Sequence, residues 1–176
     1  GLSDVSQFIQ VQRGLGASAL GISSVGGTMN MVTKSTEAQK GGSAYFGIGN
    51  DGFRKYSVSF STGLMDNGWA ITFMGALNTG DGYVKGTNYE GWTYFGNISK
   101  VINDHHKLSL TAFGAPQWHN QRSTMHYIED YKNSPDGGRF NNGYGYINGE
   151  AVGSGYGYNY YHKPQVSLNH YWTIDD

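Results

Sequence analysis

An antiparallel all-β fold is predicted by three features of this sequence. From residue 42 onward, apolar and polar residues alternate with a period of two, which places them on opposite faces of extended strands. Aromatic residues make up 15% of the chain and charged residues only 14%. The face opposite the apolar residues consists of Ser, Thr, Asn, Gln and Gly. Because a soluble domain carries about a quarter charged residues, this balance favours a transmembrane β-barrel that meets lipid on one side and water on the other.

Six strands of about ten residues each are expected. They cover residues 42–50, 54–63, 69–79, 92–101, 107–115 and 164–174. At about 3.3 Å per residue and a tilt near 40°, such strands span roughly 25 Å, which matches the apolar band of an outer membrane. The residues predicted to face lipid are Tyr56, Val58, Phe60, Ile71, Phe73, Leu108, Leu110, Val166 and Leu168.

The connections between these strands alternate in length. Residues 64–68 and 102–105 are short turns, whereas residues 80–91 and 116–161 are long, and the short turn at 50–52 is the exception. Outer-membrane barrels have short periplasmic turns and longer external loops. The pattern therefore predicts an extracellular loop at 116–161, opened by Pro116 at the end of a strand. It also places Trp69 and Trp172 at the periplasmic interface, where aromatic girdles occur.

Residues 11–34 precede this pattern and read VQRGLGASALGISSVGGTMNMVTK. Two short strands joined by glycine-rich turns are expected here, because glycine adopts positive φ angles without cost. The stretch resembles the end of the plug domain of TonB-dependent outer-membrane receptors, whose pattern runs V-x-R-G, S, Y-G and G-G-x-I-N-I-x-T-K. The matching residues are Val11, Arg13, Gly14, Ser18, Gly21, Gly26, Gly27, Asn30, Thr33 and Lys34. Leu20, Met29 and Met31 depart from the pattern but remain apolar.

This resemblance implies a domain organisation. Residues 1–34 would be the C-terminal part of a plug domain, 35–41 a linker, and 42–176 the first strands of a plugged barrel. A barrel wide enough for a plug takes about 22 strands, so the chain is expected to be a partial segment of a longer protein.

The resemblance also implies a function, which is the import of a scarce ligand across the outer membrane of a Gram-negative cell. The partners would be a TonB-type energy-transducing protein, acting through a TonB box absent from this chain, and outer-membrane lipid. A surface lipoprotein and a small-molecule or oligomeric ligand complete the expected set. The ligand is left open among iron chelates, haem, cobalamin, glycans and peptides.

Two kinds of site residue are predicted. By the resemblance, Arg13 follows the first plug strand and contacts barrel-wall carboxylates; the alternative is a solvated arginine at a strand end. The long segment 116–161 interleaves aromatic residues with glycine and asparagine, a composition suited to recognition surfaces. Its predicted ligand-binding residues are Trp118, His119, Tyr127, Tyr144, Tyr146 and Tyr158. The alternative for this segment is a loop that only packs on its neighbours.

The sequence gives little support to other kinds of site. Residues 14–19 fit the dinucleotide fingerprint G-x-G-x-x-A, but no helix-forming stripe follows, so no cofactor is expected. The six histidines lack ligand spacing and no serine has a nucleophile context, so neither a metal site nor catalysis is predicted. A net charge of −1 gives no support for nucleic-acid binding.

Three non-receptor alternatives stay open. One is a passive porin or surface adhesin barrel, and another is a soluble β-sandwich that binds carbohydrate. The third is a glycine-rich turn in an unrelated β protein. No apolar window is long enough for a transmembrane helix.

Overall fold

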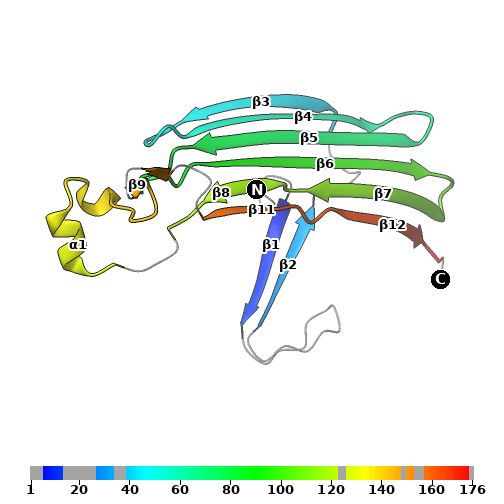
Figure 1. Cartoon of the computed structure of the whole chain (residues 1–176). Helices are drawn as coiled ribbons and strands as arrows, with labels where there is room; N and C mark the ends of the chain where they lie inside the picture. Colours follow the sequence, from blue (N-terminus) through cyan, green and yellow to red (C-terminus); the bar gives the residue numbers. More distant parts are fainter. Residues whose placement is uncertain are drawn as a thin grey trace.

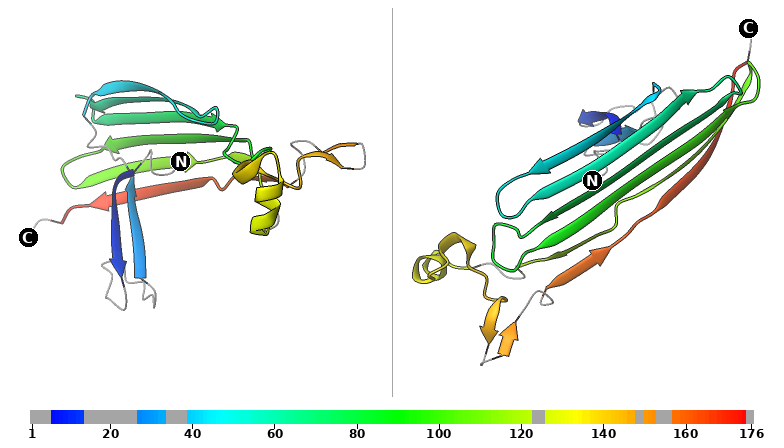
Figure 2. Two further views of the ribbon diagram at one scale, coloured as in Figure 1. Left: turned by 90° about the vertical axis from the view of Figure 1, so that its left-hand side faces the viewer. Right: turned by 90° about the horizontal axis from the view of Figure 1, so that it is seen from above.

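The computed structural model describes residues 6–13, 27–33, 39–122, 126–147, 150–152 and 157–174. Its main element is an antiparallel sheet of eight strands arranged in a single layer (Figures 1 and 2). The strands are β3 (Gly41–Ile48), β4 (Arg54–Leu64), β5 (Trp69–Gly80), β6 (Tyr89–Val101), β7 (His106–Gly114), β8 (Gln117–Asn120), β11 (Tyr158–Tyr161) and β12 (Gln165–Trp172). The antiparallel all-β prediction is confirmed, and each of the six predicted strands begins and ends within three residues of an observed boundary.

The eight strands occupy six positions across the sheet, because two of these positions are each filled by two strands end to end. Strands β3 to β6 pair in sequence order, and β6 then pairs with β7 along one part of its length and with β8 along the other. Strand β12 pairs with β7, and β11 with β8, so the last two positions each consist of two pieces. Pro116 and Pro164 lie in the two interruptions, where a residue without an N–H cannot donate to the ladder.

The prediction that Pro116 opens an irregular segment is therefore wrong. Pro116 interrupts the strand, but its carbonyl still accepts a hydrogen bond of 2.8 Å from the Trp92 N–H. Pairing resumes at once, with Gly91 opposite Gln117. Strands β8 and β11 thus belong to the sheet, and the connection between them begins at residue 121 and ends at residue 157.

The two faces of this sheet differ in polarity and in exposure. On the apolar face, Ile71, Ile98 and Leu110 stand side by side on neighbouring strands and are 38–44% exposed. On the polar face, the adjacent row of Thr72, Asn97 and Thr111 is at most 9% exposed. The residues predicted to face lipid all lie on the apolar face and are all between 37% and 70% exposed. They belong to no dry core within the described part of the chain.

The polar face also holds a small apolar cluster. Met74, Phe95 and Phe113 lie opposite one another on β5, β6 and β7, and Phe95 is 1% exposed. Aromatic and apolar cross-strand neighbours of this kind stabilise a sheet by roughly 0.2–1 kcal/mol per pair. Phe95 is an apolar residue at a polar-face position of its strand, and it is there because it packs against these neighbours.

One end of the sheet, called here the turn end, carries two short turns. The β4–β5 turn is closed by the Met65 N–H donating to the Trp69 carbonyl at 2.8 Å. In the β6–β7 turn, the Asn103 side-chain oxygen accepts hydrogen bonds from the N–H groups of His105 and His106. Trp69 and Trp172 both lie at this end, next to Lys100 and His106. The opposite end, called the loop end, carries the β3–β4 turn and the two long connections (Figure 1).

Strands β1 (Ser6–Arg13) and β2 (Gly27–Thr33) form a separate two-stranded antiparallel sheet. Val11 is paired with Met29 and Ile9 with Met31, and neither strand pairs with the large sheet. In Figure 1 the pair runs across the direction of the large sheet's strands and extends below them. Most of the predicted linker at 35–41 lies outside the described residues.

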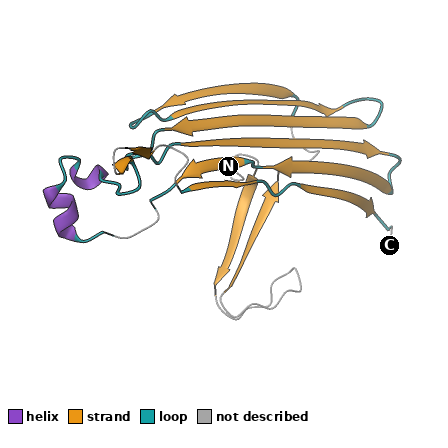
Figure 3. Cartoon of the chain, viewed as in Figure 1, coloured by secondary structure: helices purple, strands orange, loops and turns teal. Residues whose placement is uncertain are grey.

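The connection between β8 and β11 contains further regular structure beyond the sheet (Figure 3). It holds helix α1 (Ile128–Asn133), the 3-10 turn η2 (Gly137–Arg139) and a small hairpin of β9 (Gly145–Ile147) and β10 (Glu150–Val152). The Asp130 carboxylate accepts a hydrogen bond of 2.9 Å from the Tyr127 N–H and so begins the helix. No helix in the described ranges is long and apolar enough to cross a membrane.

Candidate functional site

Three connections meet at the loop end of the sheet: residues 49–53, 81–88 and 121–157. Backbone hydrogen bonds join them directly. The Asp81 N–H donates to the Asp51 carbonyl at 2.8 Å, and the Lys85 N–H donates to the Arg139 carbonyl at 2.9 Å. The short β3–β4 turn, an exception in the predicted length pattern, is therefore part of the same cluster as the two long loops.

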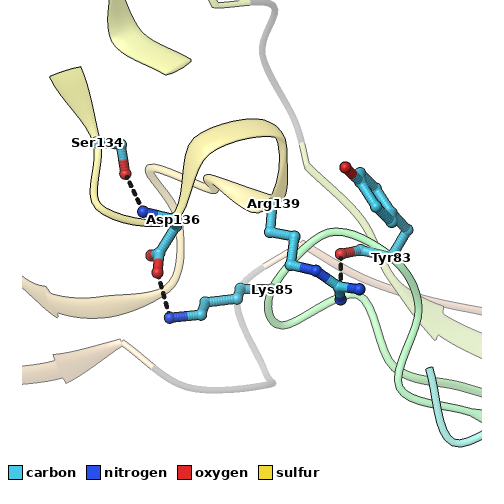
Figure 4. Close-up of polar contacts among 5 residues, drawn as sticks. All are labelled: Tyr83, Lys85, Ser134, Asp136 and Arg139. Atoms are coloured by element: carbon cyan, nitrogen blue, oxygen red, sulfur yellow. Dashed lines mark hydrogen bonds and ion pairs between the residues drawn. The ribbon is translucent and has the colours of Figure 1, made fainter. Parts of the chain in front are cut away.

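Arg139 links all three connections, and Figure 4 shows one of these contacts, that with Tyr83. Its Nη1 lies 2.6 Å from the Asp51 carboxylate and donates to the Tyr83 carbonyl at 3.1 Å. The guanidinium also lies 4.7 Å from the centre of the Tyr83 ring. Because the Arg139 side chain is 47% exposed, this ion pair contributes at most about 1 kcal/mol to stability. The contact matters for the arrangement of the loops, since the single side chain of Arg139 contacts two other loops.

A second set of contacts holds Lys85 and the region after η2. The Lys85 ammonium pairs with the Asp136 carboxylate, and the Lys85 carbonyl accepts a hydrogen bond of 2.7 Å from Asn141. The ring of Tyr144 packs directly on Gly86, whose φ of 72° lies in the left-handed region that favours glycine. Any side chain at Gly86 would overlap that ring. Glycine is therefore favoured here both by the backbone conformation and by the contact with Tyr144.

Aromatic contacts hold the start of helix α1 against the residues that follow η2. His126 lies 5.0 Å from the Phe140 ring and 5.8 Å from the Tyr131 ring, between centroids, and its side chain is 5% exposed. Arg122 donates to the Phe140 carbonyl at 3.3 Å and lies over the Tyr131 ring. These contacts join the helix to the end of β8.

The predicted ligand-binding residues do not form one cluster. Trp118 and Tyr158 are brought together, with their rings stacked 6.0 Å apart on paired strands β8 and β11. His119 follows Trp118 in the strand and therefore lies on the opposite face. Tyr127 is 81% exposed at the start of α1, and Tyr144 packs on Gly86. The side chains of Tyr146 and Arg13 lie outside the described part of the chain.

A polar hollow of about 300 Å³ lies beside His119 at the loop end. Its lining consists of Asn78, Thr87, Tyr89, Glu90, Gly91, Gln117, Trp118, His119 and Asn120. Asn78, Gly91 and Gln117 stand opposite one another on β5, β6 and β8, and Tyr89 stands opposite His119. These residues share the polar face, and the missing side chain at Gly91 leaves room between them. The hollow is named here the Gly91 hollow.

Sequence reasoning found His119 but missed Asn78, Tyr89 and Gln117. The signal was present, because the period of two continues before Trp92 and after Pro116. Extending both strands by three residues would have aligned Tyr89 with His119 and Gly91 with Gln117. Pro116 predicts the end of the strand, so the continuation of this register beyond it is not predicted from the sequence.

A larger apolar depression of about 700 Å³ lies on the apolar face. Phe46, Tyr56, Phe73 and Trp92 surround it, and Gly75 leaves it open in the middle. Among the described residues there is no group of three or more His, Asp or Glu side chains that could hold a metal ion.

Two of the six histidines meet, since His106 Nδ1 lies 3.0 Å from His170 Nε2 and the two rings stack, whereas others lie apart. His162 forms a 2.9 Å hydrogen bond with the Tyr94 hydroxyl, while His126 is enclosed by rings. No protein-family model matches the chain, and no curated protein matches it either.

Proposed function

We propose that this chain forms part of a TonB-dependent outer-membrane receptor and that the eight-stranded sheet is a segment of its barrel wall. The observation that carries the proposal is that the apolar face of the sheet is exposed and the polar face is buried, the reverse of a water-soluble sheet. Large apolar side chains such as Phe60, Phe73 and Leu168 are 50–70% exposed, whereas Thr72, Asn97 and Ser109 are 3–7% exposed. A water-soluble sheet buries its apolar side chains, because exposing them costs about 25 cal/mol per Å². A barrel wall with lipid outside and water inside reverses that requirement.

The edges of the sheet support the same proposal. No strand pairs with the outer edge of β3, or with the free edges of β11 and β12, within the described residues. Unpaired backbone groups in lipid cost several kcal/mol each, so a membrane sheet must close. The barrel is therefore completed by further strands outside this chain, and the chain supplies six spans of its wall.

A passive porin or a surface adhesin barrel would share the reversed faces. The receptor is favoured by the plug-like motif of residues 11–34 and by the β1–β2 sheet, which pairs separately from the large sheet. In the proposed mechanism the loop end faces outward and captures the ligand. A TonB-type protein then acts on the plug from the periplasm, and plug movement opens a path through the lumen. A surface lipoprotein would dock on the same loop end.

Growth measurements on the full-length protein test this function. A strain lacking the gene and a strain lacking TonB are compared with wild type on a panel of sole iron, cobalamin, haem, peptide and glycan sources. We expect one source on which both deletions cause the same defect, and we expect the protein in the outer-membrane fraction. A soluble protein, or uptake that persists without TonB, would overturn the proposal.

Deletion of residues 123–156 tests the role of the loop end separately. The Gln121 N–H donates to the Gly157 carbonyl at 3.2 Å, so the remaining chain can be joined where the two strands already meet. We expect normal barrel insertion, seen as heat-modifiable gel mobility, together with loss of ligand binding on whole cells. Unchanged affinity and uptake would leave the segment with only a packing role.

A further inference from the structure

The Gly91 hollow offers a ligand uncharged hydrogen-bonding groups. Asn78 and Gln117 carry amides that both donate and accept, Thr87 and Tyr89 carry hydroxyls, and His119 carries an imidazole. The only carboxylate in the lining belongs to Glu90, which stands on the opposite face and accepts a 2.8 Å hydrogen bond from the Trp92 indole. A ligand in the hollow is therefore met by neutral donors and acceptors.

The cations of the neighbouring strand and loops already have partners within the protein. Lys85 pairs with Asp136, and Arg139 pairs with Asp51. Lys55 stands opposite Asn78 on the neighbouring strand and has an interaction of its own. An anionic ligand would have to break one of these contacts to find a counter-charge, whereas an uncharged ligand would not.

Shape and ring placement narrow the class of ligand. The Tyr89 ring lies against the backbone of Gly80, which fixes the ring at the side of the hollow. A fixed aromatic ring beside several neutral amides is the arrangement that suits sugar rings, which present apolar C–H faces and a rim of hydroxyls. A volume of about 300 Å³ is at the small end of ligand pockets, so the hollow is suited to a single ring.

We propose that the Gly91 hollow binds one uncharged sugar ring of a carbohydrate ligand. Tyr89 provides the stacking surface, and Asn78, Gln117 and His119 hydrogen-bond the hydroxyls. This inference rests on the proposed function, because the hollow is reached from outside through the loop end.

The test is carried out on the purified full-length protein in detergent, where binding does not require TonB. A glycan array that carries both neutral and uronic-acid oligosaccharides provides the probes, and calorimetry measures the affinity of each hit. We expect neutral oligosaccharides to bind. Asn78→Ala and Gln117→Ala should each weaken binding about tenfold, since each removes hydrogen bonds to the ligand. Tyr89→Phe should retain affinity, and Tyr89→Ala should lose it.

Asn169→Ala is the matched control, because Asn169 is an exposed amide on the polar face near the turn end. It should bind as wild type does. The inference is overturned if no neutral oligosaccharide binds, if only acidic ones bind, or if the Asn78 and Gln117 variants keep full affinity. Those results would leave outer-membrane location and TonB dependence untouched, so a failure here is distinguishable from a failure of the receptor proposal.

Discussion

The two faces of the large sheet have the same backbone and opposite chemistry. On the apolar face, side chains such as Phe73 and Val58 are at least half exposed and have no covering layer among the described residues. On the polar face, Asn97 is 3% exposed, and its amide donates to the hydroxyls of Ser109 and Thr111 at 2.9 and 2.7 Å. The polar face is thus held by hydrogen bonds between neighbouring strands. The comparison teaches that burial in this protein does not follow apolarity, because the large apolar side chains are exposed and small polar ones are enclosed.

A charge on the apolar face should have the largest effect on stability. Phe73→Arg places a cation near the middle of the predicted lipid-facing band and should lower the free energy of unfolding by about 2–4 kcal/mol. The measurement is urea unfolding of the full-length protein in lipid vesicles. Tyr45→Arg is the matched control, because Tyr45 is an equally exposed aromatic residue on the polar face. Equal effects at both positions would mean that the two faces meet the same solvent.

Removing the amide on the polar face should have the next largest effect. Asn97→Ala deletes both hydrogen bonds to Ser109 and Thr111 and leaves buried hydroxyls with fewer partners, at a cost of about 1–3 kcal/mol. The same unfolding assay measures it. Asn169→Ala, exposed on the same face, should change stability by less than about 0.5 kcal/mol. If Asn97→Ala left the free energy of unfolding unchanged, the hydrogen bonds of Asn97 with Ser109 and Thr111 would contribute nothing to stability.

The smallest effect is expected from the ion pair at the loop end. In a double-mutant cycle of Asp51→Asn and Arg139→Gln, the coupling energy should be at most about 1 kcal/mol, because both partners are partly exposed. The visible effect should be kinetic, with faster proteinase K cleavage of residues 121–157 in both single variants. Arg54→Gln, on an exposed arginine of the neighbouring strand, serves as the control. Unchanged cleavage would show that Arg139 does not hold the loops together.

Much of the sheet could be predicted because a period of two is a local property. Alternation places Ile71 and Phe73 on one face and Thr72 on the other, whatever strand lies beside them. The short turns were also readable, since Asn103 and Gly68 stand where their backbone requires them, Gly68 at a φ of 77°. Composition singled out Trp118 and Tyr158 as aromatic residues of one recognition-like segment, but it did not indicate that their rings stack.

What the sequence could not supply were the contacts between distant segments. Strand β8 keeps against β6 the register that β7 has, but the sequence around Pro116 does not show that pairing resumes after the proline. The short helix α1 depends on one carboxylate, that of Asp130, and lies in a segment without periodicity. The ion pair of Arg139 with Asp51 joins two loops through a single exposed contact.

By itself, then, the sequence determined the six long strands and which of their side chains share a face, because alternation acts residue by residue. Only the tertiary structure decided that Asn78, Tyr89, Gln117 and His119 surround one hollow, and that three loops meet at Arg139. Those arrangements require strands to be set side by side in a particular register. Register is set by the turns and by which side chains meet across neighbouring strands, so it depends on residues far apart in the chain.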